Sequence, residues 1–552
     1  MPLKKHWQWS IALCLTAAIG FSFKDDQFEI IKNLEIFTNI MKELNASYVD
    51  PISPSKLIRT GIDGMTGSLD PYTDFIDEEN IESYKMTTTG RYGGVGALIK
   101  QVGDYVMIDE PYEGFPADKA GLRAGDKILE IDGTSVKKKN TEEVSKLLKG
   151  RPNTEVTLLI ERLGETKPLT KIVKRQEIHI KSVPYYGLLD NKTGYIRLNS
   201  FTENCSKEVG NALKELKDQY HIESLVFDLR GNPGGLLDEA VNTANIFIPQ
   251  GKEVVSTRGR NNSHSQSYKT TNSPVDTNIP LVVLIDDGSA SAAEIVAGTI
   301  QDLDRGVIVG RRSFGKGLVQ STRAINYNTK VKLTTAKYYL PSGRCIQEID
   351  YSKGFNPEKM FEEMVDKPDS LHKAFKTSDG RTVYDAGGIR PDFEVDEPIP
   401  ANVTISLLSK QLVFDYATQY RMKHDQIPPP EQFELSDAEY SDFVNFLAGK
   451  ENDYTTRSEE LLKTLQETAQ KEKYDAALSS QINAIKVQMS NDKGNDLDKF
   501  KAEIKKWLEY EIVKRYFYQV GEIKESLEDD LVLKKATSIL NDKNTYSRSL
   551  QK

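Results

Sequence analysis

The feature that most constrains the fold is an alternation of apolar, strand-like runs with helical patterns between positions 194 and 309. The strands are expected at Gly194 to Asn199, Ser224 to Leu229, Pro280 to Ile285 and Gly306 to Val309, and the helices at Ser206 to Gln219, Leu236 to Phe247 and Ala292 to Leu303. Strands that alternate with helices pair in parallel and are covered by those helices, so this stretch predicts an α/β layered domain. We predict that the whole chain is α/β and multidomain.

A run of small residues joins one of these strands to the helix that follows it. The strand Leu281 to Ile285 leads into Asp286-Asp-Gly-Ser-Ala-Ser-Ala-Ala-Glu294. Small neighbours leave the hydroxyl of Ser291 approachable, and the N–H groups of the first helical turn stabilise negative charge beside it. This arrangement is typical of a nucleophile. The alternative is that Ser289 or Ser291 only caps the helix, as serines at this position commonly do.

A candidate general base, Lys316, lies between two glycines after the next strand-like run. Because Lys316 and Gln320 are an even number of residues apart, we expect both on one face of a strand. A lysine can activate a serine when burial lowers its pKa towards ~7 to 8, and Gln320 would then hold the amine in place. The alternative for Lys316 alone is a solvated surface charge.

These motifs resemble those of the carboxyl-terminal processing, or tail-specific, serine proteases. The family carries Gly-Ser-Ala-Ser-Ala-Ser/Ala-Glu and, further on, Phe-Gly-Lys-Gly-x-Val-Gln, which places Ser291, Lys316 and Gln320 in the catalytic positions. Further similar segments are Asp228-Leu-Arg-Gly-Asn-Pro-Gly-Gly235, Tyr338-Tyr-Leu-Pro-Ser-Gly-Arg344 and Gly387-Gly-Ile-Arg-Pro-Asp392. The resemblance extends over roughly positions 30 to 396.

The resemblance implies a serine endopeptidase with a crotonase-like core and a Ser-Lys dyad that works through an acyl-enzyme. It also implies that the N–H groups of Gly235 and Ala292 form the oxyanion hole. Glycine at 234 and 235 lets the backbone approach a ligand, and Ala292 lies on the helix that the nucleophile opens. A plain structural turn is the alternative for the two glycines. The mechanism needs no metal and no cofactor, and the substrates are proteins with free C-terminal tails.

Positions 86 to 175 resemble a PDZ domain. Consecutive N–H groups around Gly94, Val95 and Gly96, before a probable strand, suit the capture of a terminal carboxylate. Asn140 and Glu143 form the start of a helix by the capping-box pattern, and Gly150 ends it. We therefore expect substrate binding by strand addition, with a glycine hairpin that binds no ligand as the alternative.

The predicted organisation has five parts. They are a signal peptide or N-terminal anchor at 1–23, a helical region at 24–85, the PDZ domain at 86–175, the protease core at 176–400 and a charged helical extension at 401–552. Positively charged Lys4 and Lys5 precede an apolar run, which predicts export to the periplasm or anchoring on the outer face of the inner membrane. A membrane partner is expected only through that anchor. Cys205 and Cys345 would remain in the mature chain, but their spacing does not decide whether they pair.

The partners of the helical parts stay open. The C-terminal helices either pack on the core or on themselves, or they form a homo-oligomer or adaptor site, together with the N-terminal region. Nucleic acid is not expected as a partner because the net charge is −9 and no basic motif is present.

Three other functions are alternatives to the protease. Gly310 to Lys316 resembles the start of a phosphate-binding loop, but Gly317 stands where Ser or Thr should hold magnesium. A histidine-dependent hydrolase is disfavoured because none of the six histidines lies in a motif that recruits it to Ser291. A non-catalytic PDZ scaffold remains the main alternative, although it gives no chemical reason to keep Ser291, Lys316 and Gln320 together.

Overall fold

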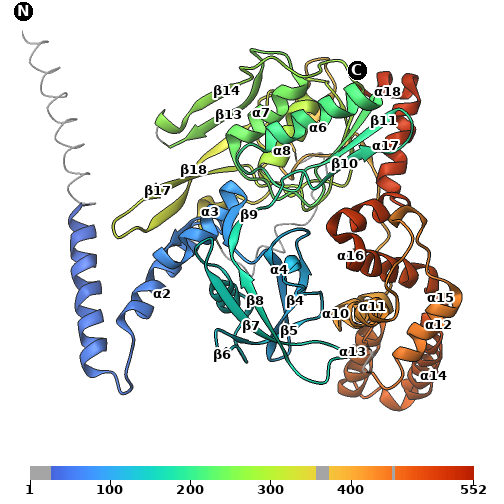
Figure 1. Ribbon diagram of the computed structural model, residues 1–552. Coiled ribbons are helices and arrows are strands. Elements are labelled where there is room, and N and C mark those ends of the chain that lie inside the picture. The colour runs from blue at the N-terminus through green and yellow to red at the C-terminus, as the bar shows by residue number, and fades with distance from the viewer. Residues whose placement is uncertain (1–26, 261, 356–371, 451–453, 552) are drawn as a thin grey trace, which may run out of the picture. The chain divides into compact units, whose positions relative to one another are not determined.

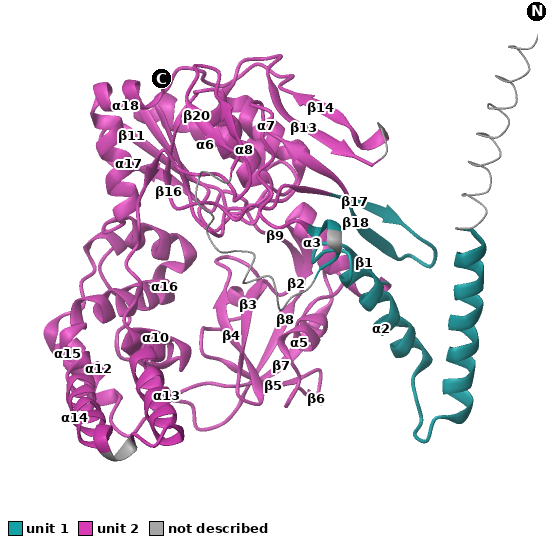
Figure 2. Ribbon diagram, turned by 180° about the vertical axis from the view of Figure 1, so that it is seen from behind, with its two compact units in different colours: residues 1–77, 320–334, 351–359 teal, residues 78–319, 335–350, 360–552 magenta. Residues whose placement is uncertain are grey.

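The computed structural model describes most of the chain, in two compact units that are coloured separately in Figure 2. The described residues are 27–260, 262–355, 372–450 and 454–551. The first unit holds the described residues of 1–77, 320–334 and 351–359, and the second holds those of 78–319, 335–350 and 360–552. The predicted leader at 1–23 lies outside the described residues.

The first unit consists of helices and a small antiparallel sheet. A helix over residues 27–47 precedes α2 (Pro54–Gly67), whose first turn is capped by the side chain of Ser53. Strand β1 (Asp74–Ile76) pairs with the start of β18 (Lys330–Tyr339), which also pairs with β17 (Leu318–Ala324). A short helical turn, η3 (Tyr351–Lys353), completes this unit.

The second unit begins with a small antiparallel sheet of order β3-β4-β5-β7-β8, with β6 paired to β5. Its strands are β3 (Ala97–Val102), β4 (Tyr105–Pro111), β5 (Lys127–Ile131), β6 (Thr134–Ser135), β7 (Glu155–Glu161) and β8 (Leu169–Lys174). The helices of this part are η1 (Glu78–Asn80), α3 (Ile81–Thr89), α4 (Pro116–Lys119) and α5 (Thr141–Leu148), and β2 (Arg91–Gly94) pairs with β9 (Gln176–His179). The predicted capping box is present, because the side chains of Asn140 and Glu143 each accept the other's backbone N–H.

A mostly parallel sheet of order β10-β11-β12-β15-β16-β21 forms the centre of the second unit. Its strands are β10 (Tyr185–Leu188), β11 (Thr193–Arg197), β12 (Ser224–Asp228), β15 (Leu281–Ile285), β16 (Val307–Gly310) and β21 (Phe393–Glu394). Only β10 runs antiparallel to its neighbour. The connecting helices are α6 (Cys205–Tyr220), α7 (Leu237–Phe247) and α8 (Ala292–Asp302). The predicted α/β layered core is therefore confirmed, with each element within two residues of its expected position.

Both faces are buried at the centre of this sheet, which explains why β12, β15 and β16 are largely apolar. One face packs against α6, α7 and α8 in the largest hydrophobic cluster. The other face packs against α17 (Leu531–Asn541), beyond which lies α18 (Lys543–Ser549), both drawn in red in Figure 1. The packed residues of the second face are Val226, Val282, Leu284, Val307 and Val309 from the sheet and Val532, Leu533, Ala536, Ile539 and Leu540 from α17.

Short strands and turns surround the central sheet. They are β13 (Glu253–Gly259), η2 (Asn262–His264), β14 (Gln266–Lys269), β19 (Ala374–Lys376) and β20 (Thr382–Tyr384). Strand β13 pairs with β14 and with the end of β18. Cys205 and Cys345 are both free thiols, and burial raises the pKa of Cys205.

The remaining C-terminal helices are α10 (Asn402–Ser409), α11 (Leu412–Lys423), η5 (Pro430–Gln432), α12 (Asp437–Phe446), α13 (Arg457–Lys471), α14 (Asp475–Gly494), α15 (Asp496–Lys499) and α16 (Lys501–Leu527). Of these, α10, α11, α12 and α16 pack around their own hydrophobic cluster, and α13 and α14 pack against each other. Helix α16 is kinked at Tyr518, where the backbone has a φ of 54°. Over the described part of the chain, no helix has both the length and the apolar character that crossing a membrane requires.

Candidate active site

Ser291 stands at the junction of β15 and α8, at the N-cap position of the helix. Its backbone has φ 54° and ψ −112°, a conformation that non-glycine residues rarely adopt and that stores strain. Ser289 serves the structure of the loop, because its hydroxyl donates to the carbonyl oxygen of Leu229 at 2.8 Å and accepts the N–H of Asp286 at 3.0 Å. The two serines of the motif therefore have different surroundings, and only Ser291 sits in a strained turn.

One buried carboxylate connects the loop of Ser291 with the loop of Lys316. Oε2 of Glu294 accepts the backbone N–H of Ser291 at 2.8 Å and the backbone N–H of Lys316 at 3.1 Å. Glu294 lies in the first turn of α8, and its side chain is completely buried. The two predicted catalytic residues are thus brought together through their main chains.

Three further donors complete the surroundings of Glu294. They are the N–H of Gly315 at 2.6 Å, the hydroxyl of Ser313 at 2.7 Å and the hydroxyl of Tyr338 at 3.1 Å. Burial raises the pKa of Glu294, and the hydrogen bonds from these donors oppose that rise by favouring the carboxylate. Glu294 is not among the site residues predicted from the sequence. The signal was present as Ser-x-x-Glu at 291 to 294, the capping-box spacing at the start of an apolar helix.

Lys316 lies in an irregular loop, which corrects the expectation that it shares a strand with Gln320. Strand β17 begins at Leu318, two residues after Lys316. The cause is the pair of flanking glycines, because Gly315 and Gly317 have φ of 81° and 65°, which no strand accommodates. Gln320 does lie on β17, and its side-chain amide donates to Oγ1 of Thr334 at 3.2 Å within the first unit. The structure brings the main chains of Ser291 and Lys316 together in the second unit, whereas Gln320 belongs to the first unit.

The glycine pair after β12 lies against Ser291. A Cβ atom at Gly234 would be 2.7 Å from Cβ of Ser291 and 2.9 Å from the nitrogen of Ala292. A Cβ atom at Gly235 would overlap the main chain of Phe201. Both positions also have positive φ, 97° and 148°, so glycine is required by space and by conformation.

The predicted oxyanion donors fit the chemistry of a developing negative charge. Gly235 is bridged to Phe201 through its neighbours, because the carbonyl of Gly234 and the N–H of Leu236 make the bonds. Within the described residues, the N–H groups of Gly235 and Ala292 have no protein acceptor. Ala292 opens α8, so its N–H is also at the positive end of the helix.

The predicted tail-binding residues form the turn between β2 and β3. Gly94 ends β2, and Val95 and Gly96 lead into β3. Gly96 has φ 75°, and a Cβ atom there would be 2.7 Å from Cβ of Phe115. A groove of about 180 Å³ opens beside this turn, lined by residues of β3 and the end of α5 together with Met86, Tyr92, Val95 and Tyr112.

Comparison with known proteins agrees with this architecture. The model of peptidase family S41 matches residues 192–358, the PDZ domain model matches 107–162, and the model "probable PDZ-protease, C-terminal helical domain" matches 403–540. The chain is 37% identical over 335 residues to a carboxy-terminal-processing protease of Bartonella bacilliformis, covering 60% of this chain and 76% of that one.

Two further proteins are similar to this chain. A probable CtpA-like serine protease of Staphylococcus aureus is 38% identical over 331 residues, which is 59% of this chain and 64% of that relative's length. The solved photosystem II D1 C-terminal processing protease is 28% identical, with 64% of this chain and 86% of that chain covered and a TM-score of 0.35. The predicted family and multidomain α/β class are confirmed by the family models and by the Bartonella relative. The chain belongs to peptidase family S41, the carboxy-terminal-processing serine proteases, and carries that family's PDZ domain.

Proposed function

We propose that this chain is an exported serine endopeptidase that selects protein substrates by their C-terminal tails. The observation that carries the proposal is the cluster around Glu294, which holds the main chains of Ser291 and Lys316 beside the free N–H groups of Gly235 and Ala292. A nucleophile, a base and two oxyanion donors in one place are the parts that acyl transfer requires.

In the proposed mechanism, neutral Lys316 takes the proton of Ser291 as the serine oxygen attacks the peptide carbonyl. The N–H groups of Gly235 and Ala292 bind the resulting oxyanion. Protonated Lys316 then gives its proton to the leaving amine, and an acyl-enzyme forms on Ser291. Water, deprotonated by the same lysine, releases the acyl group. Gln320 is assigned the task of holding the lysine amine.

Substrate choice is assigned to the PDZ part. The turn at Gly94, Val95 and Gly96 would capture the terminal carboxylate, and the tail would lie along β3 in the adjacent groove. The segment that precedes the tail would then reach Ser291. Export is proposed from the apolar N-terminal stretch of the sequence alone.

The test compares the purified mature chain with Ser291→Ala and Lys316→Ala on an unstructured protein that has an apolar free C-terminus. We expect cleavage by the unaltered chain only, with no effect of a chelator. Lys337→Ala on β18 and Ser206→Ala on α6 are matched controls, because the Lys337 side chain is half exposed and Ser206 lies in the first turn of a helix that carries none of the proposed catalytic residues. Both controls should cleave normally.

The outcomes separate the protease from the scaffold. If the unaltered chain binds the tail and never cleaves, the non-catalytic PDZ scaffold is the better account. If Lys316→Ala keeps full activity, the base is a different group. Activity should also fall in acid, because only the neutral form of Lys316 accepts a proton, and full activity in acid would contradict the dyad.

A further inference from the structure

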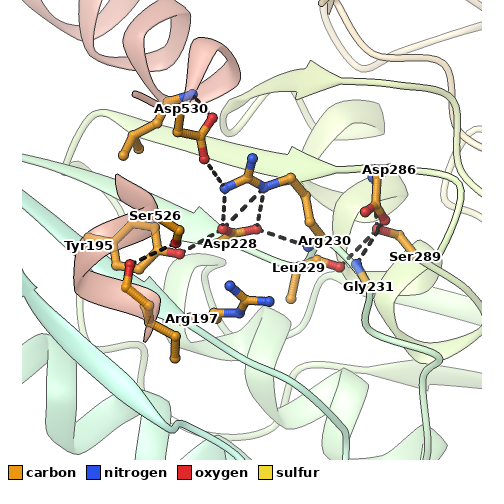
Figure 3. Close-up of polar contacts among 12 residues, drawn as sticks. Tyr195, Arg197, Asp228, Leu229, Arg230, Gly231, Asp286, Ser289, Ser526 and Asp530 are labelled. Atoms are coloured by element: carbon orange, nitrogen blue, oxygen red, sulfur yellow. Dashed lines mark hydrogen bonds and ion pairs between the residues drawn. The ribbon is translucent and has the colours of Figure 1, made fainter. Parts of the chain in front are cut away.

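Arg230 lies at the start of the loop that carries Gly234 and Gly235, directly after β12. Its guanidinium stands between two carboxylates, with Nη2 2.7 Å from Oδ2 of Asp228 and 2.6 Å from Oδ2 of Asp530 (Figure 3). The side chain of Asp228 is fully buried, and those of Arg230 and Asp530 are 13% and 10% exposed. Because water screens so little here, each of these two contacts is stronger than an ion pair on the surface.

The carboxylate of Asp228 also accepts hydrogen bonds from other donors. It accepts the hydroxyl of Tyr195 at 2.7 Å and the backbone N–H of Arg230 at 2.9 Å, in addition to the guanidinium. Glu397 also approaches Arg230, with 3.5 Å from Oε1 to Nη1, but its side chain is 46% exposed. Asp530 is therefore the buried contact that ties Arg230 to an element outside its own strand and loop.

Asp530 is held firmly by the chain around it. It is the N-cap of α17, and its Oδ1 accepts the N–H of Leu533 at 2.8 Å. Its other oxygen is the one that meets Arg230. Since α17 covers one face of the central sheet, the carboxylate is presented to Arg230 by a packed helix rather than by a free side chain.

The loop that begins at Arg230 is connected to the nucleophile at several points. The N–H of Gly231 donates to Oδ1 of Asp286 at 2.8 Å, and the carbonyl of Asn232 accepts the N–H of Ala290 at 2.9 Å. Gly234 then touches Ser291, as described above. We call residues 229–235 the oxyanion loop. This loop carries Arg230 of the ion pair near one end and Gly235, the proposed oxyanion donor, at the other.

We propose that Asp530 is a positioning residue for the oxyanion loop, acting through Arg230, so that the C-terminal helix α17 is part of the catalytic apparatus. The inference rests on the proposed function, because the loop is taken to present the N–H of Gly235 to the oxyanion. If the ion pair is lost, the loop shifts and the donor moves away from the position where negative charge develops. Binding of the substrate in its ground state does not use this donor.

The test is Asp530→Asn, measured with a peptide substrate, a peptide aldehyde and the matching peptide alcohol. Asparagine keeps the oxygen that caps α17 but removes the negative charge that faces Arg230. We expect kcat to fall about tenfold, less than the loss from deleting an oxyanion donor, with KM changed less than about twofold. The aldehyde forms a tetrahedral adduct with Ser291, so its Ki should rise about tenfold, whereas the Ki of the alcohol should stay unchanged.

Two further variants serve as controls. Asp529→Asn changes the neighbouring carboxylate, which is 56% exposed and pairs with Lys506 and Lys534, and it should leave all four constants unchanged. Asp530→Glu keeps the charge and should recover part of kcat.

Each outcome decides a separate point. If Asp530→Asn keeps the kcat and the aldehyde affinity of the unaltered chain, the positioning role is wrong while the protease stands. If it weakens the aldehyde and the alcohol equally and lowers the thermal midpoint in step, Asp530 is only structural. If the unaltered chain neither cleaves nor binds the aldehyde, the proposed function itself fails, and the inference fails with it.

Discussion

The carboxylate of Glu294 accepts the backbone N–H of Lys316, with 3.1 Å between the nitrogen and Oε2. The same oxygen accepts the N–H of Ser291, so the separation of the two loops depends on one side chain. Each of its two oxygens accepts at least one backbone N–H, that of Gly315 on Oε1 and those of Ser291 and Lys316 on Oε2, and a backbone N–H cannot accept a hydrogen bond in return. Only an acceptor fits this position without loss of bonds.

Glu294→Gln should therefore impair catalysis while the fold survives. The amide places an NH₂ group against N–H donors, so the loops of Ser291 and Lys316 separate. We expect kcat to fall about 10- to 100-fold with KM nearly unchanged, measured on an unstructured protein substrate. Glu239→Gln is the matched control, because Glu239 also accepts two backbone N–H groups, those of Asn204 and Ser206, and neither belongs to the loops of Ser291 and Lys316. An equal loss of kcat in both variants would refute a specific role for Glu294.

The strained backbone of Ser291 leads to a prediction about stability. At φ 54° and ψ −112°, a glycine is relaxed whereas serine and alanine are strained. Glycine is also the better N-cap than alanine. Ser291→Gly should therefore be about 1 kcal/mol more stable to unfolding than Ser291→Ala, although both are inactive. The thermal midpoints of the two variants measure this difference, and a less stable glycine variant would mean that the turn relaxes in solution.

The sequence predicted the elements that carry the chemistry because each has a strong local signal. The four apolar runs have no other plausible structure than buried strands, and small residues around Ser291 mark a tight junction. The position of Ser291 between β15 and α8 follows directly from these signals. The even spacing of Lys316 and Gln320 wrongly predicts a strand around Lys316, because the positive φ of Gly315 and Gly317 makes this segment an irregular loop.

Contacts between residues far apart in the chain could not be predicted in this way. Asp530 and Arg230 are 300 positions apart, and nothing in the local sequence of either residue names the other. The packing of α17 on the sheet could not be predicted either, because an apolar helix face fits a core, a partner or another helix equally well. Only tertiary structure distinguishes a helix that completes the core from those that pack on one another.

The buried carboxylate of Glu525 predicts a pH-dependent stability. Its side chain on α16 is 1% exposed, and burial raises its pKa from 4.5 to about 7, although Lys506 lies 3.4 Å away and opposes the rise. Such a group contributes stability that is fully present below its unfolded pKa and is lost as the pH rises through its folded pKa. Folding should therefore become less favourable between about pH 5 and about pH 8 on account of this group.

Glu525→Gln removes that dependence. At about pH 8 the variant should be more stable than the unaltered chain by about 1 to 3 kcal/mol, and at about pH 4 the two should be equal. Thermal midpoints measured across this range test the prediction. A difference for Glu525→Gln that does not vary with pH would show that the carboxyl group does not titrate in this window.

The turn at Gly96 predicts how tail binding can be separated from catalysis. Gly96 has φ 75°, and an added Cβ atom would meet Phe115 at 2.7 Å, so Gly96→Ala must move the turn that is proposed to hold the carboxylate. Gly103 has φ 54° with nothing within 4 Å of an added Cβ, so Gly103→Ala carries comparable backbone strain without the collision. We expect Gly96→Ala to weaken binding of a labelled apolar tail peptide about tenfold or more, measured by fluorescence anisotropy, and Gly103→Ala to bind normally. With a short peptide that lacks a free carboxylate, both variants should retain kcat, because the change lies in the tail-binding turn and not at Ser291. Equal tail affinities in the two variants would instead place the carboxylate site away from this turn.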